Sequence, residues 1–291
     1  MAILIPVRRI GRREFDFARQ VAVMAIVNRT PDSFHDQGRT FELARAVEAA
    51  LAAVAAGADW VDVGGFAFRG DQDGIGVGEE IDRVVPVIAE IRGVTDAVIS
   101  VDTYRSEVAQ AALAAGADVI NDTNGLREPG MARVAAESGA TVIVTHSLGG
   151  PGQAVAKPSY GDVVAEVAAF LRERVRFALD AGIHAERIII DPGHDLNKNT
   201  FHSLELTRRL DEITAIGYPT LVALSNKDFI GETLGRPQQE RTEGTIAANV
   251  IAVLRGARIL RVHDVPAAVA AVRMTEAILG WRAPIAPRHN L

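Results

Sequence analysis

VAVMAIVNRTPDSFHDQG, from Val21 to Gly38, joins an apolar run directly to a polar loop. The apolar part ends at Val27, so it is too short to cross a membrane and is typical of a strand buried on both faces. Polar and turn-forming residues follow from Asn28 onward. In α/β enzymes the chemistry is carried by loops that rigid strands hold in place, and this stretch therefore predicts such a fold. The alternative is an ordinary surface turn.

The pattern of a short apolar strand followed by a helix recurs along the chain. The expected strands are 21–27, 58–65, 97–102, 117–122, 141–146, 187–193, 219–225 and 258–264. The expected helices are 41–57, 79–92, 105–115, 130–138, 161–181, 201–215, 228–234, 242–255 and 265–279. Eight such units predict a parallel sheet closed as a (β/α)8 TIM barrel. A doubly wound open sheet is the rival, but residues 28–33 contain no glycine for the phosphate loop that usually follows its first strand.

The length of 291 residues, 48% of them hydrophobic, suits a single barrel domain that covers 1–291. Within it we expect the barrel at 21–281 and an N-terminal extension at 1–20. Residues 2–20 read as a short hairpin or lid, a candidate plug for one end of the barrel.

Composition excludes several classes of protein. The chain has no cysteine, which rules out disulfides and thiolate metal sites. Its net charge is −6 and it has no long basic run, so nucleic acid is not an expected partner. No apolar run reaches the roughly 18 residues of a membrane span, and arginines at 8, 9, 12 and 13 argue against a signal peptide. We therefore expect a cytoplasmic protein that does not enter a membrane.

Polar side chains end nearly every expected strand. They are Asn28, Asp62, Asp102, Asn121, His146, Asp191, Lys227, Arg261 and His263. A single Asp in such a place is more often a helix cap than a catalyst. A barrel, however, brings the carboxyl ends of all its strands to one mouth, where the active sites of this fold lie. The series therefore predicts one shared site.

These residues fall into two chemical groups. Asp102, Asn121, Asp191 and Lys227 could grip the donor and acceptor edge of an amino-pyrimidinone ring. Asn28, Arg69, Arg261 and His263 suit an anion, to which the amides of the last helix would add. The alternative for Arg261 and His263 is a surface ion pair with Asp264. No zinc-site spacing and no nucleophile elbow is present, so an expected metal is Mg²⁺, held by phosphate oxygens and one protein ligand.

Taken in order, the strand-end motifs resemble the dihydropteroate synthase family from about Val21 to Trp281. The motifs are 28–34 (NRTPDSF), 62–65 (DVGG), 100–103 (SVDT), 120–122 (IND), 191–193 (DPG), 225–227 (SNK) and 261–265 (RVHDV). The resemblance implies a (β/α)8 barrel, commonly a homodimer, that acts in folate synthesis. Such enzymes join 6-hydroxymethyl-dihydropterin diphosphate to p-aminobenzoate and release pyrophosphate.

The resemblance also implies roles for individual residues. It assigns the pterin pocket to Asp102, Asn121, Asp191 and Lys227, and the diphosphate to Arg69, Arg261 and His263. Asn28 would contact the diphosphate through Mg²⁺. We expect the homodimer to form through the later outer helices at 201–215, 242–255 and 265–279.

The chain departs from the family pattern in its loops. The family's Glu-Ser-Thr-Arg-Pro is FAFRG at 66–70, its Gly-Phe-Gly-Lys is DLNK at 195–198, and its Ser-Arg-Lys-Ser is SNKD at 225–228. The family's Met-His-Met is THS at 145–147, and Arg29 stands where a small apolar residue is usual. Asp195 and Asp228 are expected to add negative charge near the diphosphate, which would oppose its binding.

Four functions remain open at this stage. The favoured one is a divergent homologue that keeps the barrel and its anchors but has weak or no synthase activity. The others are a working synthase with unusual loops, a regulatory protein that binds a pterin or phosphate ligand, and a methyltetrahydrofolate-type methyltransferase. The RVH motif at 261–263 and the TPDSF loop at 30–34 argue against the last, because a methyl donor carries no diphosphate.

Overall fold

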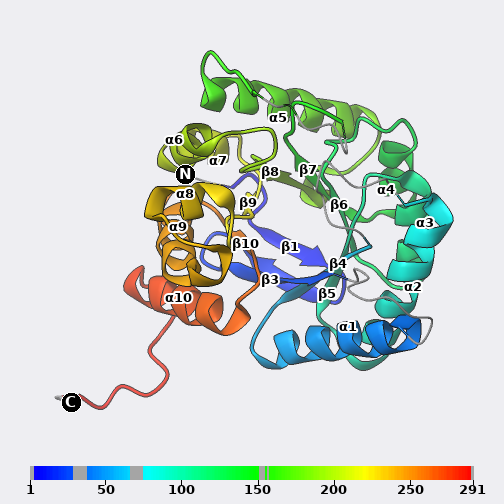
Figure 1. Cartoon of the computed structure of the whole chain (residues 1–291), viewed down its shortest axis with the longest axis horizontal. Helices are drawn as coiled ribbons and strands as arrows, with labels where there is room; N and C mark the ends of the chain where they lie inside the picture. The colour runs from blue at the N-terminus through cyan, green and yellow to red at the C-terminus, as the bar shows by residue number, and fades with distance from the viewer. Residues whose placement is uncertain (1–2, 29–37, 66–74, 151–154, 156, 290–291) are drawn as a thin grey trace.

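The computed structural model describes residues 3–28, 38–65, 75–150, 155 and 157–289; of Asn28 and residues 38–42 it describes the backbone. Eight parallel strands form a barrel inside a ring of helices (Figure 1), which confirms the predicted (β/α)8 fold. The strands are β3 (Ala22–Asn28), β4 (Trp60–Gly64), β5 (Val98–Asp102), β6 (Val119–Asp122), β7 (Thr141–Thr145), β8 (Ile188–Asp191), β9 (Leu221–Val222) and β10 (Ile259–Val262).

Helices follow the strands as expected from the sequence. They are α1 (Gly38–Ala55), α2 (Val77–Val94), α3 (Ser106–Ala114), α4 (Met131–Ser138), α5 (Val163–Asp180), α6 (Thr200–Arg208), α7 (Leu210–Thr214), α8 (Asp228–Leu234), α9 (Thr242–Leu254) and α10 (Val265–Ile278), with short 3-10 turns η1 (Ala185–Arg187) and η2 (Gln238–Glu240). Apolar strand residues such as Val61, Ile120 and Val142 pack outward against them. Among the described residues, no helix is long and apolar enough to cross a membrane.

The barrel closes most weakly between β8 and β9. A single bridge joins Ile190 to Thr220 there, whereas the other neighbouring strands pair along two to five residues. The strand expected at 219–225 is only two residues long, which corrects its predicted length. The reason is a turn: Lys227 N donates to Leu224 O at 3.2 Å, and Asn226 has the left-handed φ of 57°, so the chain leaves the sheet early.

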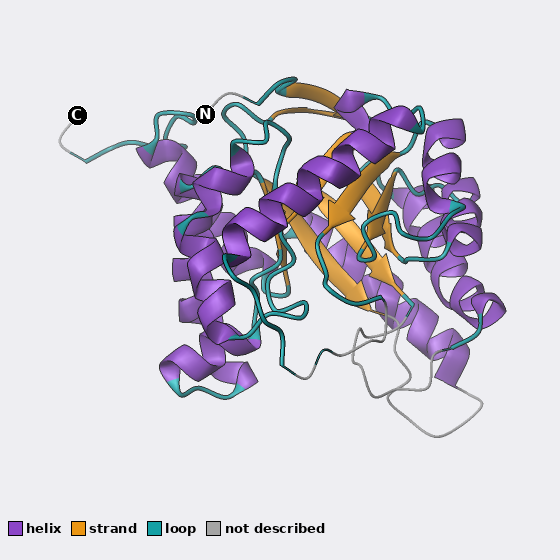
Figure 2. Cartoon of the chain, turned by 90° about the horizontal axis from the view of Figure 1, so that it is seen from above, coloured by secondary structure: helices purple, strands orange, loops and turns teal. Residues whose placement is uncertain are grey.

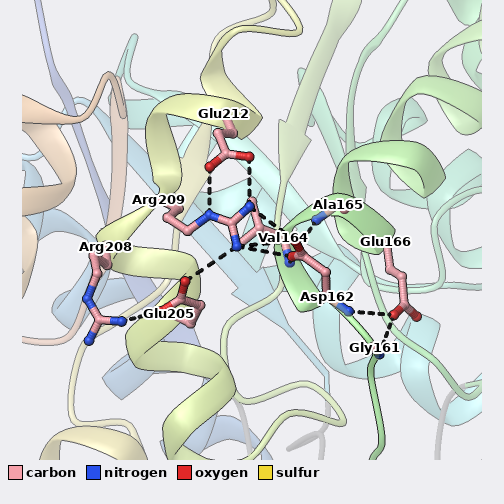
Figure 3. A network of polar contacts seen from close by, with 9 residues as sticks. All are labelled: Gly161, Asp162, Val164, Ala165, Glu166, Glu205, Arg208, Arg209 and Glu212. Atoms are coloured by element: carbon pink, nitrogen blue, oxygen red, sulfur yellow. Dashed lines mark hydrogen bonds and ion pairs between the residues drawn. The ribbon is translucent and has the colours of Figure 1, made fainter.

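The single helix expected at 201–215 is divided into α6 and α7 at Arg209, whose φ of −108° and ψ of 26° are not helical. Figure 3 shows its guanidinium among three carboxylates: Nε donates to Glu212 at 2.6 Å, and Nη1 lies 3.2 Å from Asp162 and 3.4 Å from Glu205. Asp162 also caps α5, because its carboxylate accepts from Val164 N. The ion pair between Arg209 and Asp162 therefore ties the junction of α6 and α7 to the first turn of α5.

The N-terminal segment forms an antiparallel hairpin, β1 (Val7–Ile10) and β2 (Arg13–Asp16), at the end of the barrel where the strands begin (Figure 2). Its Ile10, Phe15 and Phe17 are fully buried. They pack on interior residues from all eight strands, a set we call the apolar layer: Ala22, Met24, Trp60, Val98, Val119, Ile143, Ile189, Leu221 and Ile259. The hairpin expected within 2–20 is therefore present, and it plugs the barrel.

Two arginines attach the hairpin to the barrel wall. Arg8 is buried and its Nη1 donates to Ile188 O at 2.7 Å, and burial lowers the pKa of Arg8 to about 10. Arg258 Nε donates to Phe17 O at 2.8 Å. The accepting main-chain carbonyls lie at the start of β8 and just after the end of β2, so directed hydrogen bonds hold the plug in addition to apolar contacts.

Candidate active site

Two residues beyond the apolar layer, the inside of the barrel becomes polar. Successive side chains of a strand alternate between its faces, so a step of two keeps a residue on the same side. We call the set reached by this step the polar layer: Asp62, Ser100, Asn121, Thr145, Asp191 and Arg261. All of them are buried apart from Arg261, which is half-buried. Four of them, Asp62, Asn121, Asp191 and Arg261, belong to the strand-end series expected to share one site, and the structure places these four in one layer; Ser100 and Thr145 were not in that series.

Asp62 lies at the centre of the polar layer. Its carboxylate accepts hydrogen bonds from Ser100 Oγ, from Asn121 Nδ2 at 3.1 Å and from Arg261 Nε at 2.6 Å. It is fully buried. The sequence places Asp62 at a strand end but gives it no role, so its central position is new.

Asp102 is paired with Arg261, whose Nη2 donates to Asp102 Oδ2 at 2.8 Å. Burial raises the pKa of Asp102, the Arg261 guanidinium lowers it, and the nearby Asp62 carboxylate raises it. Arg261 therefore lies between two carboxylates. This result corrects the alternative of a surface pair with Asp264, because Asp264 instead caps α10 and accepts from Ala267 N at 3.1 Å.

Asp191 ends β8 at a sharp turn. Its Oδ1 accepts from Gly193 N at 2.7 Å, and burial raises its pKa. Gly193 has a φ of 67°, and a Cβ there would lie 2.1 Å from His146 O, so only glycine fits the turn. Lys227 Nζ donates to His194 O at 2.6 Å, and its charge opposes the rise in the pKa of Asp191. The four residues predicted to hold a ring thus share one mouth.

The predicted anion group is described only in part. Arg69 lies outside the described residues, and of Asn28 the structure gives the backbone, which pairs with Gly64 at the level of Asp102. His263 is exposed, and its Nδ1 lies 3.0 Å from Ser225 Oγ. The amides expected from the last helix are partly used, because Asp264 already accepts one of them.

The loop after β8 keeps a glycine-like backbone although it has lost the family's glycines. Asp195 has a φ of 62° and Asn197 a φ of 51°, and Asp and Asn are the residue types that best tolerate this region after glycine. Asn197 Nδ2 donates to Ser147 Oγ at 3.0 Å, which ties the loop to the end of β7. Asp195 Oδ1 accepts from Ser203 Oγ at 2.8 Å.

The two carboxylates expected to repel a diphosphate behave differently. Asp228 is 84% exposed and pairs with Arg241 Nη1 at 3.0 Å, so its charge is directed to the surface of α8. Asp195 accepts from Ser203 and remains close enough to Lys227 to raise its pKa, against the lowering caused by burial. For Asp228 the Arg241 guanidinium offsets the charge, and the effect of either carboxylate on a diphosphate stays a prediction. The altered loop at 66–70 lies outside the described residues.

A buried amine and imidazole lie beside the polar layer. Lys198 Nζ is 2.9 Å from His146 Nδ1 and donates to Gly193 O at 2.8 Å and Leu196 O at 3.0 Å. Burial lowers the pKa of Lys198 to about 7. Burial also lowers the pKa of His146 to about 2, and the charge of Lys198 lowers it further. The position of His146 at a strand end is the sequence signal for this pair; its partner Lys198 keeps the lysine of the family pattern at 195–198, although the sequence analysis gives it no role.

Glu80, in the first turn of α2, is a second buried carboxylate that the sequence did not reveal. It accepts from Thr103 Oγ1 at 2.6 Å and from Arg105 Nη1 at 2.7 Å. Burial raises its pKa, and both partners lower it. These bonds fix the segment that follows Asp102. In the part of the chain that the structure describes, no group of three or more His, Asp or Glu side chains could hold a metal ion.

Comparison with known proteins agrees with this geometry. The model of the family described as pterin binding enzyme matches residues 24–263. A protein of Mycobacterium tuberculosis named inactive dihydropteroate synthase 2 is 48% identical over 268 residues, 90% of this chain and 84% of its own length. The dihydropteroate synthase of Escherichia coli is 41% identical over 257 residues, 88% of this chain and 91% of its own.

Solved structures show the same likeness. The dihydropteroate synthase of Xanthomonas albilineans, determined with 4-aminobenzoic acid, superimposes with a TM-score of 0.87 at 40% identity. The match covers 97% of this chain and 99% of that one.

Proposed function

This chain belongs to the pterin binding enzyme family as a homologue of dihydropteroate synthase, and on that premise we propose that it binds a pterin ring but has weak or no synthase activity. The observation that carries ring binding is the common mouth of Asp102, Asn121, Asp191 and Lys227. Three oxygen-bearing side chains and one ammonium there present the acceptors and donor that an amino-pyrimidinone edge requires.

Two facts support weak turnover. The chain is 48% identical to relatives named inactive. Its loop at 66–70 has also lost the hydroxyl groups that the family pattern places there. Each charge-assisted hydrogen bond that is lost in a transition state costs about 1.5–3 kcal/mol, so two losses slow a reaction by a factor on the order of 10² to 10⁴.

The experiment separates binding from turnover. Calorimetry with 6-hydroxymethylpterin should detect binding, and complementation of a cell that lacks its own synthase should fail. Growth without supplied folate products would favour the second candidate, a working synthase. A chimera with the family's loops at 66–70 and 194–198 should recover some activity if the loops, and not the anchors, are at fault. Absence of pterin binding would favour a regulatory protein for a phosphate ligand.

The proposal includes Mg²⁺ with a diphosphate ligand. The described residues offer oxygen ligands singly and not as a cluster, which fits an ion held largely by phosphate oxygens. Asn28, at the end of β3, would supply the protein ligand, and Arg69, Arg261 and His263 would face the phosphates. Pyrophosphate titrated with and without Mg²⁺ tests this: the ion should tighten binding, and Asn28→Ala should remove the difference.

We also propose a homodimer, in a cytoplasmic location, through the faces of α9 and α10, which lie side by side (Figure 1). Ile251 and Leu254 on α9 are 47% and 59% exposed, and Met274 and Ile278 on α10 are 62% and 72% exposed. An apolar face of this kind is typical of an interface. Light scattering should give a dimer mass that Met274→Glu with Ile251→Glu reduces to a monomer, whereas Val94→Glu on α2 should not.

A further inference from the structure

Asp62 receives one side-chain donor from each of three other strands. Ser100 comes from β5, Asn121 from β6 and Arg261 from β10. Two of these three belong to the groups expected to hold a ring and an anion. A single buried carboxylate therefore contacts both halves of the mouth.

The bond to Asn121 fixes the orientation of its amide. An ionised carboxylate only accepts hydrogen bonds, so the amide must turn its nitrogen toward Asp62. The Asn121 oxygen is then directed away from Asp62, and it has no hydrogen-bond partner among the described residues. That oxygen accepts hydrogen bonds, so it favours a ligand whose facing edge carries an N–H or O–H donor.

The bond to Arg261 fixes the guanidinium in the same way. Nε donates to Asp62 and Nη2 donates to Asp102, so the plane of the group is set by two carboxylates. Within the described ranges, Nη1 has no hydrogen-bond partner. An anion can therefore meet the remaining N–H groups without breaking either pair.

We propose that Asp62 is a positioning residue that sets the orientation of Asn121 and Arg261 together and so couples the ring half of the mouth to the anion half. The inference rests on the proposed function and deepens it. Asp62 need not touch a ligand, because it acts through the two side chains it holds. Removal of its charge frees the Asn121 amide to flip and the Arg261 guanidinium to rotate.

The test compares Asp62→Asn with Asp122→Asn. Asp122 is a fully buried carboxylate on β6; among the described residues, its hydrogen-bond donors are only the backbone amides of Asn124, at 2.8 Å, and Leu126, at 2.6 Å. It is therefore matched in burial and chemistry but does not hold Asn121 or Arg261. The probes are 6-hydroxymethylpterin and pyrophosphate with Mg²⁺, titrated separately by calorimetry.

Asp62→Asn should weaken both probes by at least about fivefold, while Asp122→Asn changes each by less than about twofold. Weakening of one probe alone, or equal effects of the two variants, would overturn the proposal. If Asp62→Asn does not fold, Ser100→Ala, which removes one of the three bonds to Asp62, should weaken both probes in the same direction.

A ligand-free measurement separates this inference from the proposed function. If the unmodified protein binds neither probe, the proposed function fails. The inference is then decided by NMR, from the hydrogen exchange of the Arg261 Nε–H group. That exchange should be faster in Asp62→Asn than in the unmodified protein and in Asp122→Asn; an unchanged rate would overturn the proposal.

Discussion

The apolar and polar layers lie two residues apart on the same strands, and they are held by different forces. Trp60 and Ile259 in the apolar layer pack against the apolar side chains of the hairpin. Asp62 and Arg261, one step further along the same two strands, meet through a directed ion pair. Packing tolerates small changes of angle, whereas hydrogen bonds do not. Six strands, β4 to β8 and β10, thus contribute a residue to the apolar layer and another to the polar layer.

The largest effect should come from the apolar layer. Phe15→Ala removes a fully buried ring between Phe17 and Trp60, and it should lower the free energy of unfolding by about 3–5 kcal/mol. Urea unfolding measures the loss. Ile285→Ala, at a side chain that is 86% exposed, is the control and should change stability by less than about 0.5 kcal/mol. Equal losses would mean that the hairpin is not part of the core.

Arg261→Ala tests the polar layer. It leaves Asp62 and Asp102 without their cation, and breaking such a pair costs up to about 3–5 kcal/mol. The same change should weaken pyrophosphate binding by at least about tenfold at fixed salt. The double variant Asp62→Leu with Arg261→Leu should be more stable than Arg261→Leu alone, because it leaves one buried carboxylate, Asp102, without its cation and not two. Unchanged pyrophosphate affinity would place the anion elsewhere.

Acid should act through His146. Burial holds its pKa at about 2, below the ordinary 6.5, so below pH 6.5 the unfolded chain binds the proton first and stability falls. Between pH 7 and pH 5 this group alone should remove about 1–2 kcal/mol. His146→Gln should flatten that part of the curve by the same amount. If the stability of His146→Gln and of the unmodified protein depended on pH in the same way, the acid destabilisation would come from other titratable groups.

The smallest effect should come from the loop after β8, outside both layers. Asn197→Gly relieves a left-handed backbone but removes the bonds to Ser147 and to Val155 N. These effects oppose each other, and the net change should stay within about 1 kcal/mol. Thermal unfolding can measure it. A loss above about 2 kcal/mol would mean that the side chain of Asn197, more than its backbone, holds the loop.

Most of the fold could be predicted from the sequence because most strands and helices have a local sequence signal. The apolar runs and the glycines that stop the helices need no knowledge of distant residues. The division at Arg209 could not be predicted, because it depends on a pair with Asp162, 47 residues away in the chain. The early end of β9 likewise depends on the turn at Asn226.

The site was predicted as a set of strand ends but not as a network. Asp102, Asn121 and Asp191 are recognisable because polar residues end apolar runs. Asp62 is also recognisable as a polar strand end. It lies two residues after Trp60 on β4, and because alternate residues of a strand share a face, its side chain is expected inside the barrel. Glu80 and Lys198 lie in a helix and a loop, and their burial depends on tertiary contacts with Thr103 and His146.

The plug also bears on how the protein is made. The carbonyl of Phe17 accepts a hydrogen bond from Arg258, which is synthesised 241 residues later. The amide of Val21 donates to Glu276, which is synthesised 255 residues later. At a ribosomal rate of about 5–20 residues per second, the delay is on the order of tens of seconds. During that time the barrel that buries the rings of Phe15 and Phe17 is incomplete. A nascent chain of this protein should therefore engage chaperones early, and translation products that stop before β10 should aggregate.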